Sequence, residues 1–515
     1  MSHPQSNKAN KAIERLCGEA SQAWSRQDYQ KSISLLEQAV QKEPSNPSLH
    51  LNLARAHGLR YDYAAAERCI EKALQVSQGR VEILEEAAAI WPVKKVELML
   101  QYLERANQKK GVSIRALTSL ADIYLLDGRI DEAREAIGRA GQIDRKDPRV
   151  LLREAEIKRQ LGHVTEAEPQ LSELLANASA DVLTRVRAAY TLAGILDGTG
   201  RYDDAMAALL EGKAIQRAQA APLAAALQQM QKLNVEMAQC ITGSILDRWR
   251  AEGARLQPAR RVALLTGHPR SGTTLLEQVI DAHSDVISLE ETTLIHDEIY
   301  VPMGRDFPAN SGIFQMLDSA PPSVLSGLRE NYFRCAGMYL RQDIGKRLLI
   351  DKNPGVNVMV PVLARVFPET KFLVALRDPR DVVMSCFMQS LTLTPVSSSY
   401  LSLGEAVKQY ASVMDFWRAM MPRLGDRGMY VRYEEMVEDL PKVARSVLSF
   451  LGLEFEENVL KFYEHAQTKR VSSPSQADVK KPVYRSAIGR WRNYEKYLDP
   501  YLAGLEPFLK EWNYR

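Results

Sequence analysis

Small residues recur at a spacing of 34 over the first part of the chain, and this period limits the possible fold more than any other feature. Pairs at this offset are Ala20 and Ala54, Ala39 and Ala73, Ala121 and Ala155, and Ala133 and Ala167. Small side chains let two helices approach closely, so each period predicts a helix, a short turn and a second helix. Residues 1–213 are therefore expected to form an all-α superhelix of stacked hairpins.

Five such units can be recognised between about residues 16 and 213, and a degenerate stretch around 80–107 predicts a sixth. The period and the small residues resemble tetratricopeptide repeats. Stacked repeats present a concave face that commonly binds peptides. Two roles stay open at this point: the face recognises an acceptor substrate or a peptide partner, or the array is a spacer or an oligomerisation surface.

The rest of the chain divides into a helical linker at 214–257 and a domain at 258–515. Lys and Arg total 67 against 64 Asp and Glu, which does not suggest a nucleic-acid-binding protein. The five cysteines lie far apart, without metal-ligand spacing. The first residues lack the apolar core of a signal peptide, and no long apolar run predicts a membrane span. We therefore expect a cytoplasmic protein.

Residues 261–283 predict a strand, a loop bounded by glycines and a helix. The apolar run 262–265 reads as a buried parallel strand, and helical spacing of apolar residues begins after Thr273. In this arrangement the backbone N–H groups of the loop and the positive end of the helix dipole converge on one point. The segment therefore predicts an anion-binding cradle.

The spacing of Gly267 and Gly272 is that of a nucleotide-binding phosphate loop, but Thr273 stands where that loop carries a lysine. The only side-chain cation near the loop is Arg270. An anion smaller or less charged than a triphosphate is therefore expected. Hydroxyl donors are predicted from Ser271, Thr273 and Thr274.

Two later strand-like runs also end at a cation. Residues 347–354 predict a strand that presents Lys352, and residues 371–376 predict a strand followed by Arg377. Strands that alternate with helices predict a parallel sheet, in which ligands bind beyond the carboxyl ends of the strands. Arg270, Lys352 and Arg377 are therefore expected around one helix N-terminus, in an α/β domain of the P-loop type.

In their order along about residues 258–505, these motifs resemble the sulfotransferases that use 3′-phosphoadenosine-5′-phosphosulfate (PAPS), and most closely the tyrosylprotein sulfotransferases. The resemblance implies a 5′-phosphosulfate loop made of Arg270, Ser271, Gly272, Thr273 and Thr274. It implies a 3′-phosphate site made of Arg377 and Ser385, with Tyr433 at the adenine. It also implies a closing loop that contributes Ser473, Lys481 and Arg490. The repeats before this domain resemble those that bacterial-type proteins join to a sulfotransferase domain.

The same resemblance assigns catalytic roles. Glu290-Glu291-Thr292 resembles the Glu-Glu-Thr motif of the family, so Glu291 is expected to take the proton of a hydroxyl or phenol acceptor. Lys352 is expected to bridge the leaving oxygen, with Arg270 stabilising the charge that develops there. The product is 3′,5′-adenosine bisphosphate, and no metal is expected because a sulfuryl group carries less charge than a phosphoryl group.

Several alternatives stay open. A P-loop kinase is opposed by Thr273, and a repeat scaffold with an inactive nucleotide-binding domain is a further possibility. His296 is a rival base, because some small-molecule sulfotransferases use histidine. Protein tyrosine, a glycan hydroxyl and a small phenol all remain acceptor classes. Leu289 stands where the tyrosylprotein enzymes often have glycine, so the acceptor pocket can differ.

Overall fold

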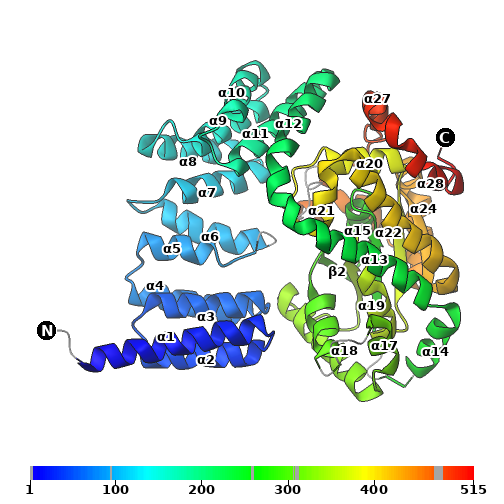
Figure 1. The fold of residues 1–515 in the computed structure, drawn as a ribbon, viewed down its shortest axis with the longest axis horizontal. Coiled ribbons are helices and arrows are strands. Elements are labelled where there is room, and N and C mark those ends of the chain that lie inside the picture. The colour runs from blue at the N-terminus through cyan, green and yellow to red at the C-terminus, as the bar shows by residue number, and fades with distance from the viewer. Residues whose placement is uncertain are drawn as a thin grey trace. The chain divides into compact units, whose positions relative to one another are not determined.

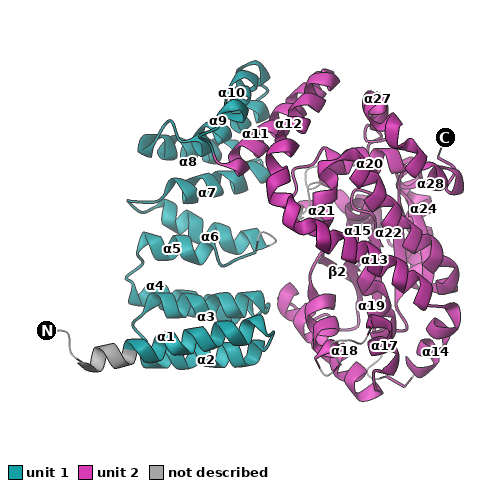
Figure 2. Cartoon of the chain, viewed as in Figure 1, with its two compact units in different colours: residues 1–180 teal, residues 181–515 magenta. Residues whose placement is uncertain are grey.

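The computed structural model describes residues 4–92, 95–253, 255–256, 260–305, 307, 312–468 and 479–514. The chain divides into two compact units, residues 1–180 and 181–515, coloured separately in Figure 2. In these described ranges, no helix combines the length and the apolar character needed to cross a bilayer.

The first unit consists of consecutive helices that pair into hairpins (Figure 1). They are α1 (Pro4–Ser25), α2 (Tyr29–Lys42), α3 (Pro47–Leu59), α4 (Tyr63–Val76), α5 (Val81–Ala88), α6 (Val96–Asn107), α7 (Ile114–Leu126), α8 (Ile130–Ile143), α9 (Pro148–Gln160) and α10 (Val164–Ala176). The alanines that recur every 34 residues are buried in both helices of their hairpins. The predicted helical repeats are confirmed, and small side chains occupy the positions where the helices approach closely.

The degenerate stretch around 80–107 forms the hairpin of α5 and α6. Helix α5 is short, and Trp91 follows it as a buried side chain. The Trp91 ring lies 6.0 Å from the ring of Tyr63 and 6.3 Å from that of Tyr102, which it stacks upon. The Trp91 ring therefore adds apolar packing beside the short helix α5.

The second unit starts with one more hairpin and continues into an α/β arrangement. Its helices are α11 (Val182–Gly198), α12 (Tyr202–Ala220), α13 (Ala224–Cys240), α14 (Gly243–Gly253), α15 (Thr273–Asp281), α16 (Val301–Gly304), α17 (Ile313–Ser319), α18 (Pro322–Leu340), α19 (Val360–Val366), α20 (Pro379–Phe387), α21 (Pro395–Ser398), α22 (Leu403–Leu424), α23 (Tyr433–Glu438), α24 (Leu440–Leu451), α25 (Phe462–Thr468), α27 (Glu495–Leu498) and α28 (Glu506–Glu511). Residue 213 lies within α12, and the domain boundaries expected at 213 and 257 stay a prediction.

The described residues of this unit form one five-stranded parallel sheet in the order β2-β3-β1-β4-β5. The strands are β1 (Val262–Gly267), β2 (Val286–Glu290), β3 (Leu348–Lys352), β4 (Lys371–Leu376) and β5 (Gly428–Arg432). The predicted fold class is confirmed. The strand order reverses at β1, so the carboxyl ends of β1, β3 and β4 surround the crevice in which such sheets bind ligands.

Alternation along β3 sends its side chains to opposite faces of the sheet. Leu348 and Ile350 belong to the apolar cluster that includes residues of α15 and α24. Asp351 lies on the other face, where the hydroxyl of Tyr332 in α18 donates to its Oδ2 at 2.7 Å. Lys352 therefore shares the face of Leu348 and Ile350, and its side chain enters the sheet surface that α15 covers.

Candidate active site

Both glycines of the predicted cradle occupy conformations that require glycine. Gly267 has φ +131°, and a Cβ there would lie 2.6 Å from the carbonyl oxygen of Ala375 in β4. Gly272 has φ +93°, and a Cβ there would lie 2.6 Å from Cδ2 of Tyr433. Side chains at either position would collide with backbone or with the aromatic ring. The loop between β1 and α15 is therefore held close to β4 and to the start of α23.

The loop ends at the N-terminus of α15, where Gly272 is the N-cap and offers no side-chain hydrogen bond to the first turn. Backbone N–H groups and the positive end of the helix dipole are thus directed at the loop. Ser271, Thr273 and Thr274 are buried beside it. Burial lowers the pKa of His268 to about 4, against the effect of its contact with the Pro269 carbonyl, so this side chain is neutral at pH 7.

Two arginines meet at the loop. Arg270, at φ +70°, donates from Nε to Ser385 Oγ at 3.1 Å. Arg377, which follows β4, donates from Nη1 to the carbonyl of Arg270 at 3.2 Å and from Nη2 to the carbonyl of Ala487 at 2.5 Å. Its guanidinium carbon lies 4.9 Å from the centroid of the Tyr433 ring. Arg270, Arg377, Ser385 and Tyr433 therefore lie around one loop.

Lys352 lies at the adjacent strand end. Its Nζ is 2.9 Å from Glu291 Oε1, and the turn after it is tied to the cradle because the N–H of Gly355 donates to the Gly267 carbonyl at 2.9 Å. Glu291 has φ +47°, a conformation that is rare for a residue with a side chain. Its N–H donates to the Lys352 carbonyl at 2.7 Å, which holds it there. Strained backbone of this kind clusters at functional sites.

The charges of three carboxylates act on the Lys352 ammonium. Burial acts to lower the pKa of Lys352, but the charges of Glu277, Glu291 and Glu290 together raise it above its ordinary value. Glu277, on α15, is fully buried, and its Oε2 lies 3.4 Å from Lys352 Nζ. The sequence reasoning identified the lysine and Glu291 but missed Glu277. In the sequence, Glu277 is a carboxylate one turn into the cradle helix, and no motif sets it apart.

Comparison with known proteins bears on the identity of this site. Residues 263–457 match the model of a sulfotransferase family, and residues 23–89 match a tetratricopeptide repeat model. The chain carries a sulfotransferase-family domain. The matched range contains the cradle, Glu291, Lys352, both arginines, Ser385 and Tyr433.

The relatives of this chain are distant in sequence. An uncharacterised protein of Aquifex aeolicus is 24% identical over 79% of this chain and 52% of its own length. Protein-tyrosine sulfotransferase 1 of Danio rerio is 27% identical over 44% of this chain and 64% of its own length. The chain thus spans between about half and two thirds of these two relatives. The solved sulfotransferase domain of the Synechococcus PCC 7002 olefin synthase aligns at 22% identity over 46% of this chain and 89% of that one, with a TM-score of 0.34.

The predicted closing segment of the sulfotransferase domain is only partly described. Ser473 lies outside the described residues, and Lys481 is exposed. Arg490 forms an ion pair with Asp197 at the end of α11. Asp197 also accepts a hydrogen bond from the hydroxyl of Tyr494 at 2.7 Å. The hairpin of α11 and α12 therefore holds Arg490, which was predicted to close over the nucleotide.

The same segment is attached to the cradle side by Asp381 of α20. The carboxylate of Asp381 accepts from the N–H of Gly489 at 2.7 Å and from that of Trp491 at 2.9 Å. Together with the Arg377 bond to Ala487, these contacts hold residues 487–491 beside the predicted 3′-phosphate site.

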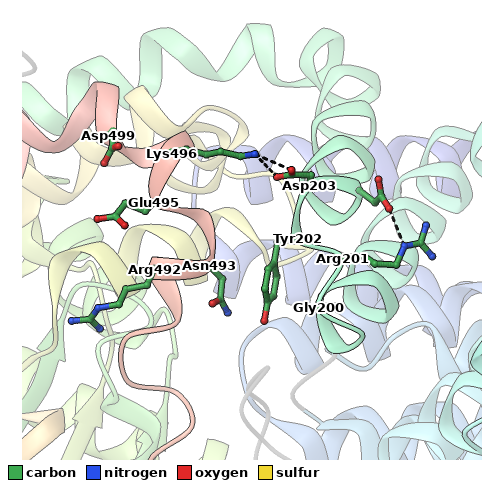
Figure 3. Close-up of a pocket in the computed structure, with 10 residues that line it drawn as sticks. Gly200, Arg201, Tyr202, Asp203, Arg492, Asn493, Glu495, Lys496 and Asp499 are labelled. Atoms are coloured by element: carbon green, nitrogen blue, oxygen red, sulfur yellow. Dashed lines mark hydrogen bonds and ion pairs between the residues drawn. The ribbon is translucent and has the colours of Figure 1, made fainter.

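Beyond this segment, the C-terminal helical turns meet the start of α12 around a pocket of about 570 Å³ (Figure 3). Asp203 accepts from Lys496 Nζ at 2.8 Å and from the Tyr497 hydroxyl at 2.9 Å. The pocket lining includes no residue of the cradle. It marks a junction between α12 and the C-terminal turns, and we assign it no role in the reaction.

The rival base His296 lies in a helical turn after β2. Its Nδ1 is 2.8 Å from Asp297, and its ring packs against Tyr300. These contacts are within its own turn, whereas Glu291 contacts Lys352 directly. Of the two candidate bases, Glu291 is therefore the one that contacts Lys352, while the contacts described for His296 stay within its own turn.

Proposed function

We propose that this protein transfers a sulfuryl group from PAPS to a hydroxyl or phenol acceptor. The observation that carries the proposal is the ion pair of Lys352 and Glu291 at 2.9 Å, placed on the strand next to an anion cradle that has Thr273 where a nucleoside triphosphatase has its lysine. The family match supports sulfuryl transfer at this site.

The residues present fit the nucleotide. The two glycines let the loop pack closely against β4 and Tyr433, and the start of α15, which lacks a side-chain cap, offers backbone donors to a 5′-phosphosulfate. Arg377 has a buried Nε without a hydrogen-bond partner among the described residues, and a bound anion would supply that partner. With Ser385 it would hold the 3′-phosphate, while Arg270 would contact the 5′-phosphosulfate and Tyr433 would flank the adenine.

When bound, the nucleotide supplies a sulfuryl group whose bond to the 5′-phosphate oxygen breaks as the acceptor oxygen bonds to sulfur. Glu291 would take the acceptor proton onto Oε1, the atom that now contacts Lys352. The Lys352 ammonium and the cradle N–H groups would stabilise the negative charge on the leaving oxygen. Lys481 and Arg490 would close over the phosphates. That no metal takes part, and that the repeats bind the acceptor or a partner, are further predictions of this proposal.

Substitution of the proposed base, Glu291, distinguishes an effect on turnover from an effect on nucleotide affinity. Glu291→Gln should leave the affinity for 3′,5′-adenosine bisphosphate nearly unchanged and lower turnover by about two to four orders of magnitude. Turnover is measured as sulfate transfer from radiolabelled PAPS to a panel of tyrosine peptides, glycans and small phenols. Glu290→Gln is the matched control and should keep most of the activity. Equal activity of the two variants would remove Glu291 from the role of base.

A further inference from the structure

Glu277 is a charged residue with no exposure to solvent, placed where the proposed chemistry occurs. It lies one turn into α15, and its Oε2 is 3.4 Å from Lys352 Nζ. Lys352 is itself 1% exposed and is 2.9 Å from Glu291. One buried ammonium thus stands between two carboxylates, and only one of them belongs to the expected catalytic set.

The second carboxylate has a consequence for the reaction cycle. When Glu291 accepts the acceptor proton it becomes neutral, and Lys352 loses the charge of its closer partner. Burial favours the neutral amine, so a lysine left without a carboxylate would tend to lose its proton. The titratable groups that act on Lys352 are Glu277 from α15 and Glu290 and Glu291 from the end of β2.

We propose that Glu277 is a positioning residue that keeps Lys352 charged and directed at the cradle while Glu291 is protonated. This inference rests on the proposed function, because it assumes that Glu291 is the base and that Lys352 meets the leaving oxygen. Glu277 acts only through Lys352. The shared face of β3 and α15 brings the two side chains together, so the contact follows from strand alternation and helix position rather than from a flexible loop.

The test uses Glu291→Gln to represent the protonated base, so that Lys352 loses its ion pair with Glu291 and keeps that with Glu277. The affinity for 3′,5′-adenosine bisphosphate is measured by calorimetry from pH 7 to 9.5 in the full-length protein. Glu291→Gln alone should show nearly constant affinity across this range. Adding Glu277→Gln should make the affinity fall by about tenfold or more as pH rises, because a neutral Lys352 no longer attracts the 5′-phosphate.

Two controls separate this effect from a general loss of structure. Glu277→Asp in the Glu291→Gln background keeps the charge and should restore most of the constant affinity, and it covers the case in which Glu277→Gln fails to fold. Glu369→Gln in the same background removes the carboxylate that pairs with buried Arg329 and should behave like Glu291→Gln alone.

A flat pH dependence in the Glu277→Gln, Glu291→Gln protein would overturn the inference while leaving the proposed function intact. A steep dependence in the Glu277→Asp protein would also overturn it, because charge would then not be the relevant property. Absence of bisphosphate binding by the wild-type protein would instead overturn the proposed function, and the role of Glu277 with it.

Discussion

The packing of Tyr433 against the cradle can be tested by adding one methyl group to Gly272. A Cβ at this position would lie 2.6 Å from the Tyr433 ring, in a backbone conformation of φ +93°. The positive φ costs a residue with a side chain roughly 1–2 kcal/mol. Displacing a packed ring adds about 1–3 kcal/mol, as overpacking does in protein cores. We therefore expect Gly272→Ala to reduce the free energy of unfolding by about 2–5 kcal/mol.

Gly452→Ala is the matched control. Gly452 has φ +73°, and a Cβ there would meet no atom within 4 Å, so only the backbone cost applies. Urea unfolding of both variants should show Gly272→Ala to be less stable by about 1–3 kcal/mol. In a Tyr433→Ala background the extra cost should disappear. Equal destabilisation by the two alanines, or an extra cost that survives removal of the ring, would refute the packing described here.

Three further predictions concern binding and pH. Arg377→Ala should weaken the binding of 3′,5′-adenosine bisphosphate roughly 30-fold, about 2 kcal/mol, and that of adenosine 5′-phosphate much less. Equal losses of affinity for the two ligands, measured by calorimetry, would place the 3′-phosphate elsewhere. Asp197→Ala should remove the ion pair that holds Arg490 and tighten bisphosphate binding a few-fold. An unchanged dissociation constant would show that Arg490 does not reach the nucleotide. The pKa of His268 is about 4 in the folded chain, against an ordinary value of 6.5. As pH falls, the unfolded state therefore takes up the proton before the folded state does. Up to about 3 kcal/mol of the free energy of unfolding should be lost as pH falls from 6.5 to 4. Urea unfolding across this range should show a shallower loss in His268→Asn, and parallel curves would contradict the assignment.

The parts of the site that sequence reasoning located are those with a local signal. Gly267 and Gly272 bound a loop between an apolar run and a helical pattern, and Lys352 and Arg377 each follow an apolar run. Because parallel strands end at one edge of the sheet, these residues could be expected to meet without knowledge of the strand order. The gathering of Arg270 with Arg377 around the loop follows from that rule.

The parts that were missed depend on contacts between distant segments. Glu277 reads in the sequence as an ordinary polar residue of an amphipathic helix, and its burial depends on the pairing of β3 with β1, which places Lys352 under α15. The ion pair of Asp197 with Arg490 joins residues 293 positions apart. No periodicity or motif reports which face of a sheet lies under a particular helix, so such partners become visible only in three dimensions.

The proposed function requires that the cradle bind a doubly phosphorylated adenosine without a metal ion. Titration calorimetry of the full-length protein with 3′,5′-adenosine bisphosphate, in EDTA and again in magnesium, tests it most directly, with ATP as the competing ligand. We predict binding of the bisphosphate with the same affinity in both buffers and weak or absent binding of ATP. Tight ATP binding that requires magnesium, with no binding of the bisphosphate, would contradict the proposed function.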